Sequence, residues 1–572
     1  MKLEDLSKEQ LLEEIKKLKK RKKFGLVWEN KPEKVVEKCK IDIPILNEIT
    51  EKGIISNPDD AYNFLIEGDN YHSLSVLNYT HQSKIDVIYI DPPYNIGNGD
   101  FIYNDNYVDK EDTFRHSKWV SFMNTRLLLA YQLLKEDGVI FISIDDNELA
   151  QLKLLCDQIF KEENFISLLN IETGEVFGTK AAHVDKTFVK VKDYVLVYAK
   201  SKCLIKDKQP LYDSMRELYD SHYNTIIDES LKRKSFLLYL KENEWAKNLF
   251  DTNSLKINSK NVNMLMNYND EFRDWVYKEV AERLYADAPY SRTVDSDVLE
   301  KYRPGEPFLY DDKLLFQTST GSIRMFLNFK ESLRLSDDYL PVYGRCSIRG
   351  DLWKGFHFDM RNVQDEGMMD FKNGKKPTRL VKQLFKWLNK KDAIVLDFFA
   401  GSGTTGQAVM ELNSEDGGKR KFILCTNNEN NIAEEKCYPR LVNVIKKNPA
   451  NLKYFKTDFV PKNKVSDDTR MELVKKSTEM ICVKEGTFQE VFSSDKYKIF
   501  KDGFHSTAIL FNLDSLKELK EKIDALKLSS SIYVFSLSND TYNSDFEDLE
   551  VEHELCPIPE SILGVYRKLF KE

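Results

Sequence analysis

The sequence has few of the features that mark metal-binding, disulfide-linked or membrane proteins. Its 8 cysteines form no Cys-x-x-Cys pair and its 8 histidines no His-x-x-x-His pair, so we expect reduced thiols and neither a zinc site nor a disulfide framework. No apolar run approaches the ~20 residues that cross a bilayer. The first residues, Met1–Asp5, are charged and do not resemble a signal peptide. These absences predict a cytoplasmic protein without a membrane anchor or a bound metal.

An excess of positive charge is also missing. The chain has 85 Lys and Arg against 93 Asp and Glu, which gives a formal net charge of -8. That balance argues against a general binder of polyanions but leaves room for a local basic cleft. With 572 residues, of which 41% are hydrophobic and 31% charged, the chain is too long for one ordinary core. Roughly two to four domains are therefore expected.

One strand end carries a tetrapeptide suited to holding a planar amino group. The sequence Asp91-Pro92-Pro93-Tyr94 directly follows the apolar run Ile85–Ile90, which is long enough for one buried parallel strand. Ligands of open α/β sheets bind at such carboxyl ends. A carboxylate and nearby carbonyls accept amine hydrogens, two prolines fix the loop, and an aromatic ring stacks on a flat heterocycle. The alternative is a rigid β-to-α turn with an aspartate cap.

A second strand end carries two glycines. The run Ala393–Asp397 predicts a buried strand, and Gly401 and Gly403 then permit a tight turn with close backbone approach to a ligand. There is no third glycine at the dinucleotide spacing and no Gly-Lys-Ser/Thr loop, so the ligand need not carry phosphates. Asp397 is placed to pair with a cationic amine, and Phe399 to pack on a thioether or an adenosine. Alone, such a turn is equally compatible with a purely structural role.

On either side of these motifs and between them, the hydrophobic pattern alternates between strands and helices. Strands are predicted at 64–67, 138–144, 193–198, 421–426, 507–511 and 531–535, and helices at 117–135, 149–160, 380–388 and 514–527. Asp145 and Glu148 have capping-box spacing before helix 149–160, an interpretation we prefer to a metal site in the acidic run 145–148. The block before residue 350 is too long for a β-to-α connection and predicts an inserted domain.

The two motifs together resemble those of a known enzyme family. With Asn95 the tetrapeptide becomes Asp-Pro-Pro-Tyr-Asn, which resembles the catalytic loop of DNA amino-methyltransferases. The pattern Asp-x-Phe-x-Gly-x-Gly-Thr-Thr at 397–405 resembles their S-adenosylmethionine motif. The catalytic motif precedes the cofactor motif across a long insert, as in the β class of these enzymes. More narrowly, residues 24–29 and 426–431 look like those of Mod subunits of type III restriction-modification systems.

This resemblance implies the fold class and the domain organisation. The expected fold is α/β, with a circularly permuted Rossmann-like S-adenosylmethionine-dependent methyltransferase sheet. The expected parts are an N-terminal helical segment (1–50), the catalytic half (51–200), an inserted target recognition domain (201–350), the cofactor half (351–455) and a small C-terminal α/β domain (456–572). The last part carries no catalytic pattern, and we expect it to serve assembly.

The resemblance also assigns the site residues. Catalysis is expected from Asp91, Pro92, Pro93 and Tyr94. The expected cofactor-binding residues are Asp69, Asn70, Lys376, Pro377, Asp397, Phe399, Ala400, Gly401, Gly403, Thr404 and Thr405. Many family members place an acid for the cofactor ribose at the end of the next strand. This chain has Thr426 there, with Glu429 as the nearest acid, and both stay candidates.

The implied reaction moves a methyl group from S-adenosylmethionine to N6 of an adenine flipped out of double-stranded DNA. Asp91 and the carbonyl of Pro92 would draw the amine hydrogens, flipping costs a few kcal/mol, and stacking on Tyr94 returns about 1–3 kcal/mol. Four alternatives stay open. They are methylation of N4 of cytosine, methylation of a protein or small molecule, a non-catalytic DNA-binding subunit, and a solitary methyltransferase without a nuclease partner.

The resemblance implies partners as well as a substrate. Type III Mod subunits work as dimers, so we expect a homodimer, together with a restriction (Res) subunit because the chain has no nuclease motif of its own. The C-terminal domain would contribute to the dimer contact or, alternatively, only cover a sheet edge. A helix predicted over residues 5–23, with Ser7 and Gln10 in a capping pattern, ends in the basic run Lys19–Lys23. That run either complements the helix dipole or contacts DNA phosphates.

Overall fold

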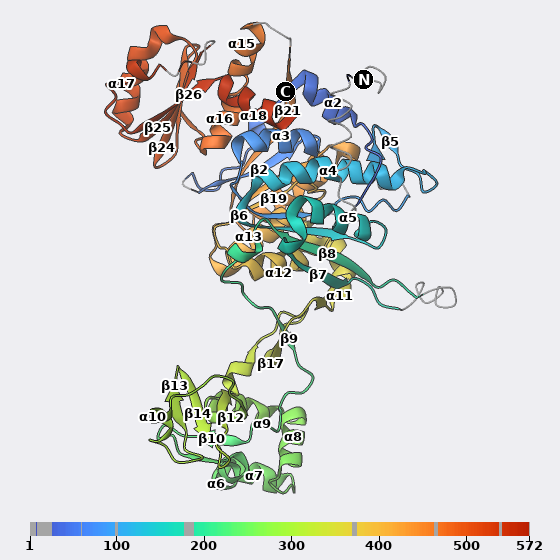
Figure 1. Cartoon of the computed structure of the whole chain (residues 1–572), viewed down its shortest axis with the longest axis vertical. Helices are drawn as coiled ribbons and strands as arrows, with labels where there is room; N and C mark the ends of the chain where they lie inside the picture. Colours follow the sequence, from blue (N-terminus) through green and yellow to red (C-terminus); the bar gives the residue numbers. More distant parts are fainter. Residues whose placement is uncertain are drawn as a thin grey trace. The chain divides into compact units, whose positions relative to one another are not determined.

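The computed structural model describes residue 7 and residues 26–570, apart from 59, 98–100, 177–187, 369–374, 463–466, 537–539 and 541 (Figure 1). Apart from Ser7, the helix expected over residues 5–23 and its basic run lie outside the described residues. The chain divides into two compact units. The first comprises Met1–Gln209 and Asp351–Glu572, and the second comprises Pro210–Gly350.

A ten-stranded sheet forms the centre of the first unit. Its strands run in the order β1-β21-β2-β20-β19-β3-β6-β8-β7-β18. Their bounds are β1 (Asp42–Glu48), β2 (Tyr62–Glu67), β3 (Ile85–Ile90), β6 (Leu134–Ile144), β7 (Phe165–Glu172), β8 (Lys192–Ala199), β18 (Leu352–Trp353), β19 (Ile394–Asp397), β20 (Lys421–Thr426) and β21 (Asn451–Pro461). From β21 to β6 neighbouring strands are parallel, whereas β8 is antiparallel to both β6 and β7.

Helices cover both faces of this sheet, so its central strands are largely buried. All six residues of β3 are buried. Figure 1 shows α3 and α4 on one side of the sheet and α12 and α13 on the other. The helices of this part are α2 (Lys34–Ile41), α3 (Asn70–Thr80), α4 (Arg115–Leu133), α5 (Leu149–Cys156), α11 (Phe356–Asn362), α12 (Thr378–Leu388), α13 (Thr404–Asp416) and α14 (Tyr438–Ile445). The expected α/β sheet is confirmed, with the half that bears the glycine turn following the half that bears the tetrapeptide.

The two motif-bearing strands are neighbours although they lie far apart in the sequence. In the β19–β3 ladder Val395 pairs with Val87 and Leu396 with Ile88. Because the two strands are parallel, their carboxyl ends meet at the same edge of the sheet. Asp397 and Asp91 therefore both lie at that edge, at the point where the sheet's order of strands reverses.

Three expectations about local structure are wrong. The segment 1–50 was expected to be helical, but Asp42–Glu48 form strand β1 at the sheet's edge, where Pro44 is tolerated. The strand β21 runs through residue 455, where the C-terminal part was expected to begin. The capping box before α5 does not form, since no side chain caps that helix. Asp145 instead accepts from the Asn147 backbone N–H, over 2.9 Å.

The second unit, Pro210–Gly350, is built from short antiparallel strands and helices. A six-stranded sheet has the order β11-β10-β12-β15-β14-β13, and a three-stranded sheet has the order β16-β17-β9. The strands are β9 (Tyr212–Ser214), β10 (Thr225–Ile227), β11 (Arg233–Ser235), β12 (Leu284–Pro289), β13 (Phe308–Tyr310), β14 (Lys313–Gln317), β15 (Ile323–Asn328), β16 (Leu333–Leu335) and β17 (Tyr343–Ile348). The helices are α6 (Phe236–Glu242), α7 (Glu244–Thr252), α8 (Ser259–Tyr268), α9 (Asp270–Trp275) and α10 (Ser296–Leu299).

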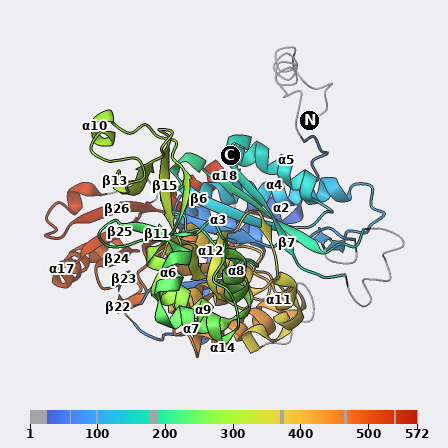
Figure 2. The same ribbon diagram turned by 90° about the horizontal axis from the view of Figure 1, so that it is seen from below.

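The C-terminal part of the first unit has a sheet of its own, whose strands lie side by side in the order β22-β23-β24-β25-β26 (Figure 2). Its elements are α15 (Asp467–Lys475), α16 (Thr478–Glu485), β22 (Gln489–Ser493), β23 (Tyr497–Lys501), β24 (His505–Leu510), α17 (Leu516–Leu526), β25 (Ser529–Phe535), β26 (His553–Ile558) and α18 (Glu560–Phe570). The expected β-α-β segment is β24-α17-β25. Helices α16 and α18 pack on α3, and the Tyr566 hydroxyl donates to the Pro44 carbonyl over 2.7 Å. Among the described residues, no helix is both long and apolar enough to cross a membrane.

Candidate active site

The tetrapeptide begins directly after β3, and its aspartate and tyrosine are joined. The Tyr94 hydroxyl donates to Asp91 Oδ1 over 2.8 Å. The Nζ atom of Lys376 lies 3.7 Å from the same oxygen and 3.4 Å from Asp193 Oδ2. Burial raises the pKa of the Asp91 carboxyl, while Lys376 and the Tyr94 hydroxyl oppose that rise. Two neighbours therefore favour the ionised form, although burial has the larger effect on this pKa.

The loop is fixed from behind as well as by its two prolines. The indole Nε1 of Trp119, in the first half of α4, donates to the Pro93 carbonyl over 2.7 Å. Trp119 is fully buried, so this bond is shielded from water. Asn95, also fully buried, ends the loop in the left-handed conformation, with φ of 58°. Pro93 is thus anchored to a helix, and Pro92 between it and Asp91 has little freedom.

The glycine turn joins β19 to α13. Gly401 and Gly403 have φ of 50° and 82°, which side-chain-bearing residues rarely adopt. Gly403 is the residue that precedes α13, and a Cβ there would lie 3.0 Å from Cys437 Sγ. A Cβ on Gly401 would meet only the Phe399 carbonyl at 3.8 Å, because that glycine faces the cavity described below. The turn therefore brings bare backbone to the edge of an open space.

Asp397 turns inward and organises the glycine turn. Its Oδ1 accepts from the Phe399 backbone N–H over 2.9 Å, and its Oδ2 accepts from Thr405 Oγ1 over 2.5 Å. The side chain is almost completely buried, and burial raises its pKa to about 7. Both carboxylate oxygens are therefore already used within the chain. This geometry favours a supporting role over a direct pairing with a cationic amine.

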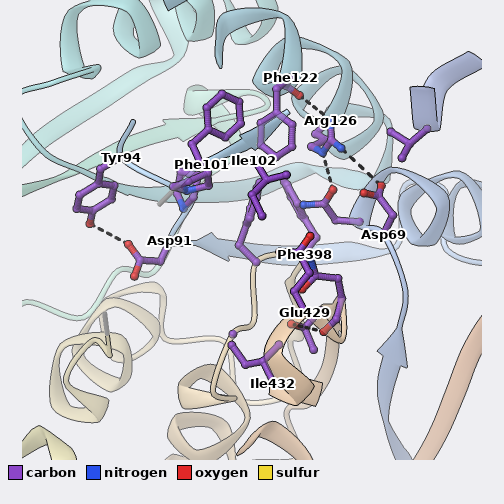
Figure 3. A pocket seen from close by; sticks show the side chains of 18 of the residues that line it. Asp69, Asp91, Tyr94, Phe101, Ile102, Phe122, Arg126, Phe398, Glu429 and Ile432 are labelled. Atoms are coloured by element: carbon purple, nitrogen blue, oxygen red, sulfur yellow. Dashed lines mark hydrogen bonds and ion pairs between the residues drawn. The ribbon is translucent and has the colours of Figure 1, made fainter. Parts of the chain in front are cut away.

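A cavity of about 580 Å³ lies between the two strand ends. Figure 3 shows Asp91 and Tyr94 on one side of it and Asp69 and Arg126 on the other. The expected site residues that line it are Asp69, Asn70, Asp91, Pro92, Pro93, Tyr94, Lys376, Phe399 and Gly401. The expected residues Pro377, Asp397, Ala400, Gly403, Thr404 and Thr405 are outside this lining. Both candidates for ribose contact, Thr426 and Glu429, line the cavity.

Sequence reasoning missed the buried charge pair in the cavity wall. The guanidinium of Arg126 in α4 donates to both oxygens of Glu33, over 3.0 and 2.6 Å, and its Nε donates to Asn70 Oδ1 over 2.5 Å. It also lies over the Phe122 ring, 3.7 Å from the centroid. Asp69 caps α3 by accepting from the Tyr71 backbone N–H. An arginine within the apolar stretch 117–135 was the signal that could have drawn attention to this wall.

Several apolar side chains that line the cavity were also missed. They are Phe101, Phe122, Phe398 and Ile432, and Figure 3 shows the three phenylalanines between the two polar ends. The hairpin that brings Phe101 and Ile102 to the cavity consists of β4 (Ile102–Tyr103) and β5 (Asn106–Tyr107). The cavity thus combines flat apolar walls with carboxylates at its ends, a combination that suits a flat heterocycle bearing polar groups.

Across the part of the chain that the structure describes, no group of three or more His, Cys, Asp or Glu side chains is arranged to hold a metal ion. In the acidic run 145–148, Asp145 Oδ2 lies 2.9 Å from Lys190 Nζ, so this carboxylate forms an ion pair with a lysine.

Known proteins share these sequence features. The family model described as DNA methylase matches residues 85–436. The StyLTI Mod subunit of a type III restriction-modification enzyme from Salmonella typhimurium is 31% identical over 409 residues, which cover 66% of this chain and 54% of that protein. The type II methyltransferase M.KpnI from Klebsiella pneumoniae is 31% identical over 382 residues, or 65% of this chain and 82% of that protein.

Structural likeness adds little to these matches. The solved PvuII DNA methyltransferase (cytosine-N4-specific) aligns over 75% of this chain and 94% of its own, at 11% identity and a TM-score of 0.31. The chain spans about half the length of the type III Mod subunits that it matches. The family match nevertheless covers more than half of the chain and contains both motifs. The chain belongs to the DNA methylase family.

Proposed function

We propose that this chain is a site-specific DNA methyltransferase that moves a methyl group from S-adenosylmethionine to N6 of a flipped adenine. The observation that carries the proposal is the juxtaposition of Asp91 and the glycine turn in one cavity. One strand end offers acceptors for an amine, and the neighbouring strand end offers bare backbone to a cofactor. Each half of a methyl transfer thereby has a suitable partner at the same sheet edge.

The tetrapeptide suits the chemistry of an exocyclic amine. The amine of adenine is a poor nucleophile because its lone pair is delocalised into the ring. The carboxylate of Asp91 and the carbonyl of Pro92 would accept its two hydrogens and oppose the positive charge that develops on nitrogen. Since the acceptors are held by prolines and by Trp119, they need little rearrangement. The base would leave the duplex at a cost of a few kcal/mol, and Tyr94 would stack on it.

The cavity walls fit S-adenosylmethionine. Gly401 would let the cofactor approach the backbone, Phe399 would pack on it, and Asp69 and Asn70 would meet its polar groups, all four of which line the cavity. Lys376 also lines the cavity. When bound, the cofactor supplies an electrophilic methyl group. The residues outside the lining, namely Pro377, Asp397, Ala400, Gly403, Thr404 and Thr405, would act by shaping the turn and its flanks.

We infer that the chain serves as the modification subunit of a type III restriction-modification system, with a restriction (Res) subunit as partner and a homodimer as its working form. The matches to Mod subunits from several bacteria and a phage support this role. The second unit, Pro210–Gly350, would read the DNA sequence. The contrasting possibility is a solitary methyltransferase without a nuclease partner.

Sequencing that detects methylated bases, on DNA from cells expressing this chain alone, tests the proposal. It should reveal N6-methyladenine at one short recognition sequence, absent from cells expressing Asp91→Ala. Methyl groups on N4 of cytosine would instead establish the alternative base, and unmodified DNA would overturn the proposal. Labelled cofactor offered with DNA or with protein then separates DNA methylation from methylation of other substrates.

A further inference from the structure

The residue that ends the tetrapeptide loop is held by a buried acid that sequence analysis assigned to another role. Asn95 Nδ2 donates to Glu148 Oε1 over 2.5 Å and to the Arg115 carbonyl over 3.3 Å. Glu148 is fully buried. It immediately precedes α5 but makes no side-chain cap there. Its carboxyl group is therefore directed at the loop rather than at its own helix.

The same oxygen of Glu148 also meets His116. His116 Nδ1 lies 2.7 Å from Glu148 Oε1, and His116 Nε2 accepts from Arg115 Nε over 3.2 Å. Because Nε2 accepts, Nδ1 carries the hydrogen and donates to Glu148. Glu148 Oε1 thus accepts from both Asn95 and His116. The first turn of α4 supplies His116 and, one turn on, Trp119, which holds Pro93.

The second oxygen of Glu148 has no such partner. Oε2 is buried and finds no hydrogen-bond donor among the described residues. Burial raises the pKa of Glu148 to about 8, with the nearby Asp145 acting in the same direction and Asn95 and Arg115 opposing it. A proton on Oε2 therefore leaves Oε1 free to act as a neutral acceptor. For stability alone, an apolar side chain would suit such a place better.

We propose that Glu148 is a positioning residue for the methyl transfer, holding Asn95 in its left-handed conformation so that Asp91 and Tyr94 keep their places at the cavity. Glu148 is outside the cavity lining and so acts only through the loop. The expected effect on the rate of methyl transfer rests on the proposed function, whereas the expected effect on the order of the loop does not. The Asn95 contact fixes one end of the loop, Trp119 fixes its middle, and β3 fixes the other end.

Three variants of the full chain test the contact from both sides. Glu148→Ala removes the acceptor. Asn95→Gly removes the donor but keeps a residue suited to φ of 58°. Glu148→Gln keeps a neutral acceptor of the same shape. Asp157→Ala is a matched control. Like Glu148, Asp157 is an acid that accepts a hydrogen bond from a buried side chain, in this case Tyr198, but it lies away from the loop.

The readouts are the single-turnover rate of methyl transfer to DNA, the cofactor affinity, and hydrogen exchange at the backbone amides of residues 94–97. Glu148→Ala and Asn95→Gly should each slow transfer by on the order of 10²-fold, the effect of a reacting group misplaced by about 1 Å. Their double variant should be no slower, because both changes remove one contact. In these variants the cofactor affinity should equal that of the parent chain, and hydrogen exchange at the amides of residues 94–97 should become faster. Glu148→Gln should restore both the rate and the protection, and Asp157→Ala should change neither.

Additive losses in the double variant would overturn the inference, as would a normal rate in Asn95→Gly. Unchanged exchange at residues 94–97 in Glu148→Ala would also overturn it. The exchange measurement needs no DNA, so it distinguishes this inference from the proposed function. If the parent chain transfers no methyl group to DNA while exchange responds as expected, the proposed function fails and the positioning contact stands.

Discussion

The Tyr94 hydroxyl lies 2.8 Å from Asp91 Oδ1 and donates to it, so the stacking ring and the acceptor carboxylate of the loop form one unit. An amine that binds to Asp91 must use the remaining lone pairs or displace this hydroxyl. Lys376, 3.7 Å from the same oxygen, adds a positive charge beside it. Burial raises the pKa of Asp91 and these two neighbours oppose that rise, so the effect of each neighbour can be tested separately.

Replacing Asp91 by alanine should remove the chemistry but not the cofactor. Without the carboxylate, one preorganised acceptor of the transition state is gone, and the transfer rate should fall by at least ~10²–10³-fold. Cofactor affinity measured by calorimetry should stay within a few-fold, because the glycine turn is untouched. A variant that keeps near-normal turnover would refute the role assigned to Asp91.

Tyr94→Phe should act mainly through pH. The hydroxyl lowers the pKa of Asp91, whose burial raises it, so its loss should raise that pKa further. Only the ionised carboxylate can accept an amine hydrogen and oppose the positive charge on nitrogen. The acid limb of the pH profile of kcat/KM should therefore move to higher pH. Near neutral pH the variant should be mildly affected, because the ring is kept. Tyr94→Ala should lose about 1–3 kcal/mol of stacking as well. An acid limb that stays in place would show that the hydroxyl does not tune Asp91.

Gly401→Val should abolish cofactor binding. It introduces a side chain at φ of 50° on the cavity wall, which costs about 1–3 kcal/mol in strain and fills the space that the cofactor would use. Gly417→Val is the control, since Gly417 has φ of 68° at the far end of α13 with nothing within 4 Å of its added Cβ. Calorimetry should show binding in the control alone, while both variants still melt cooperatively. Binding retained by Gly401→Val would place the cofactor elsewhere.

Arg126→Met should destabilise the fold strongly. It leaves Glu33 buried without its partner, a change that typically costs about 3–5 kcal/mol. Changing Glu33 to Gln in the same chain should recover part of that loss. Lys34→Met provides the comparison, because its pair with Asp105 is largely exposed, at 68% and 83%, and should be worth about 1 kcal/mol or less. Urea unfolding followed by circular dichroism measures all three; equal losses in the two single variants would contradict the expectation.

Light scattering should find the full chain as a homodimer. The C-terminal sheet has an open edge at β22, where Val491 is 37% exposed, and a lysine on such an edge opposes pairing with another chain. Val491→Lys should therefore lower the dimer fraction without changing cofactor affinity. A monomeric parent chain that methylates DNA at full rate would exclude the dimer as its working form. The packing of α16 and α18 on α3 already gives this part the alternative task of covering the sheet.

The sequence predicted those parts of the site that depend on local pattern. Asp91 and Gly401 follow apolar strands, and a strand end at a sheet edge is a local property that one chain reveals. The ion pair between Arg126 and Glu33 could not be predicted from the sequence, because it joins residues 93 positions apart that share no motif. Asp397 was expected to face a ligand, yet the sequence does not say that Thr405 supplies a donor behind it.

Glu148 shows how a local pattern can mislead. Its spacing from Asp145 fits a capping box, and that pattern predicts a bond within the helix start. In the structure a partner from 53 residues earlier, Asn95, takes the carboxylate instead. The competition between a local cap and a distant donor is decided by burial, which a single sequence does not display.

The pairing of β3 with β19 has a consequence for how the protein is made. At ~5–20 residues per second, the roughly 300 residues between these strands take about 15–60 s to emerge from a ribosome. For that interval β3, whose residues are all buried in the finished fold and all apolar except Asp86, has an unpaired edge on the side that β19 later occupies. Such an edge is a template for pairing with other chains. Newly made copies are therefore most vulnerable to co-aggregation before their second half exists, and slower translation of the insert would lengthen that exposure.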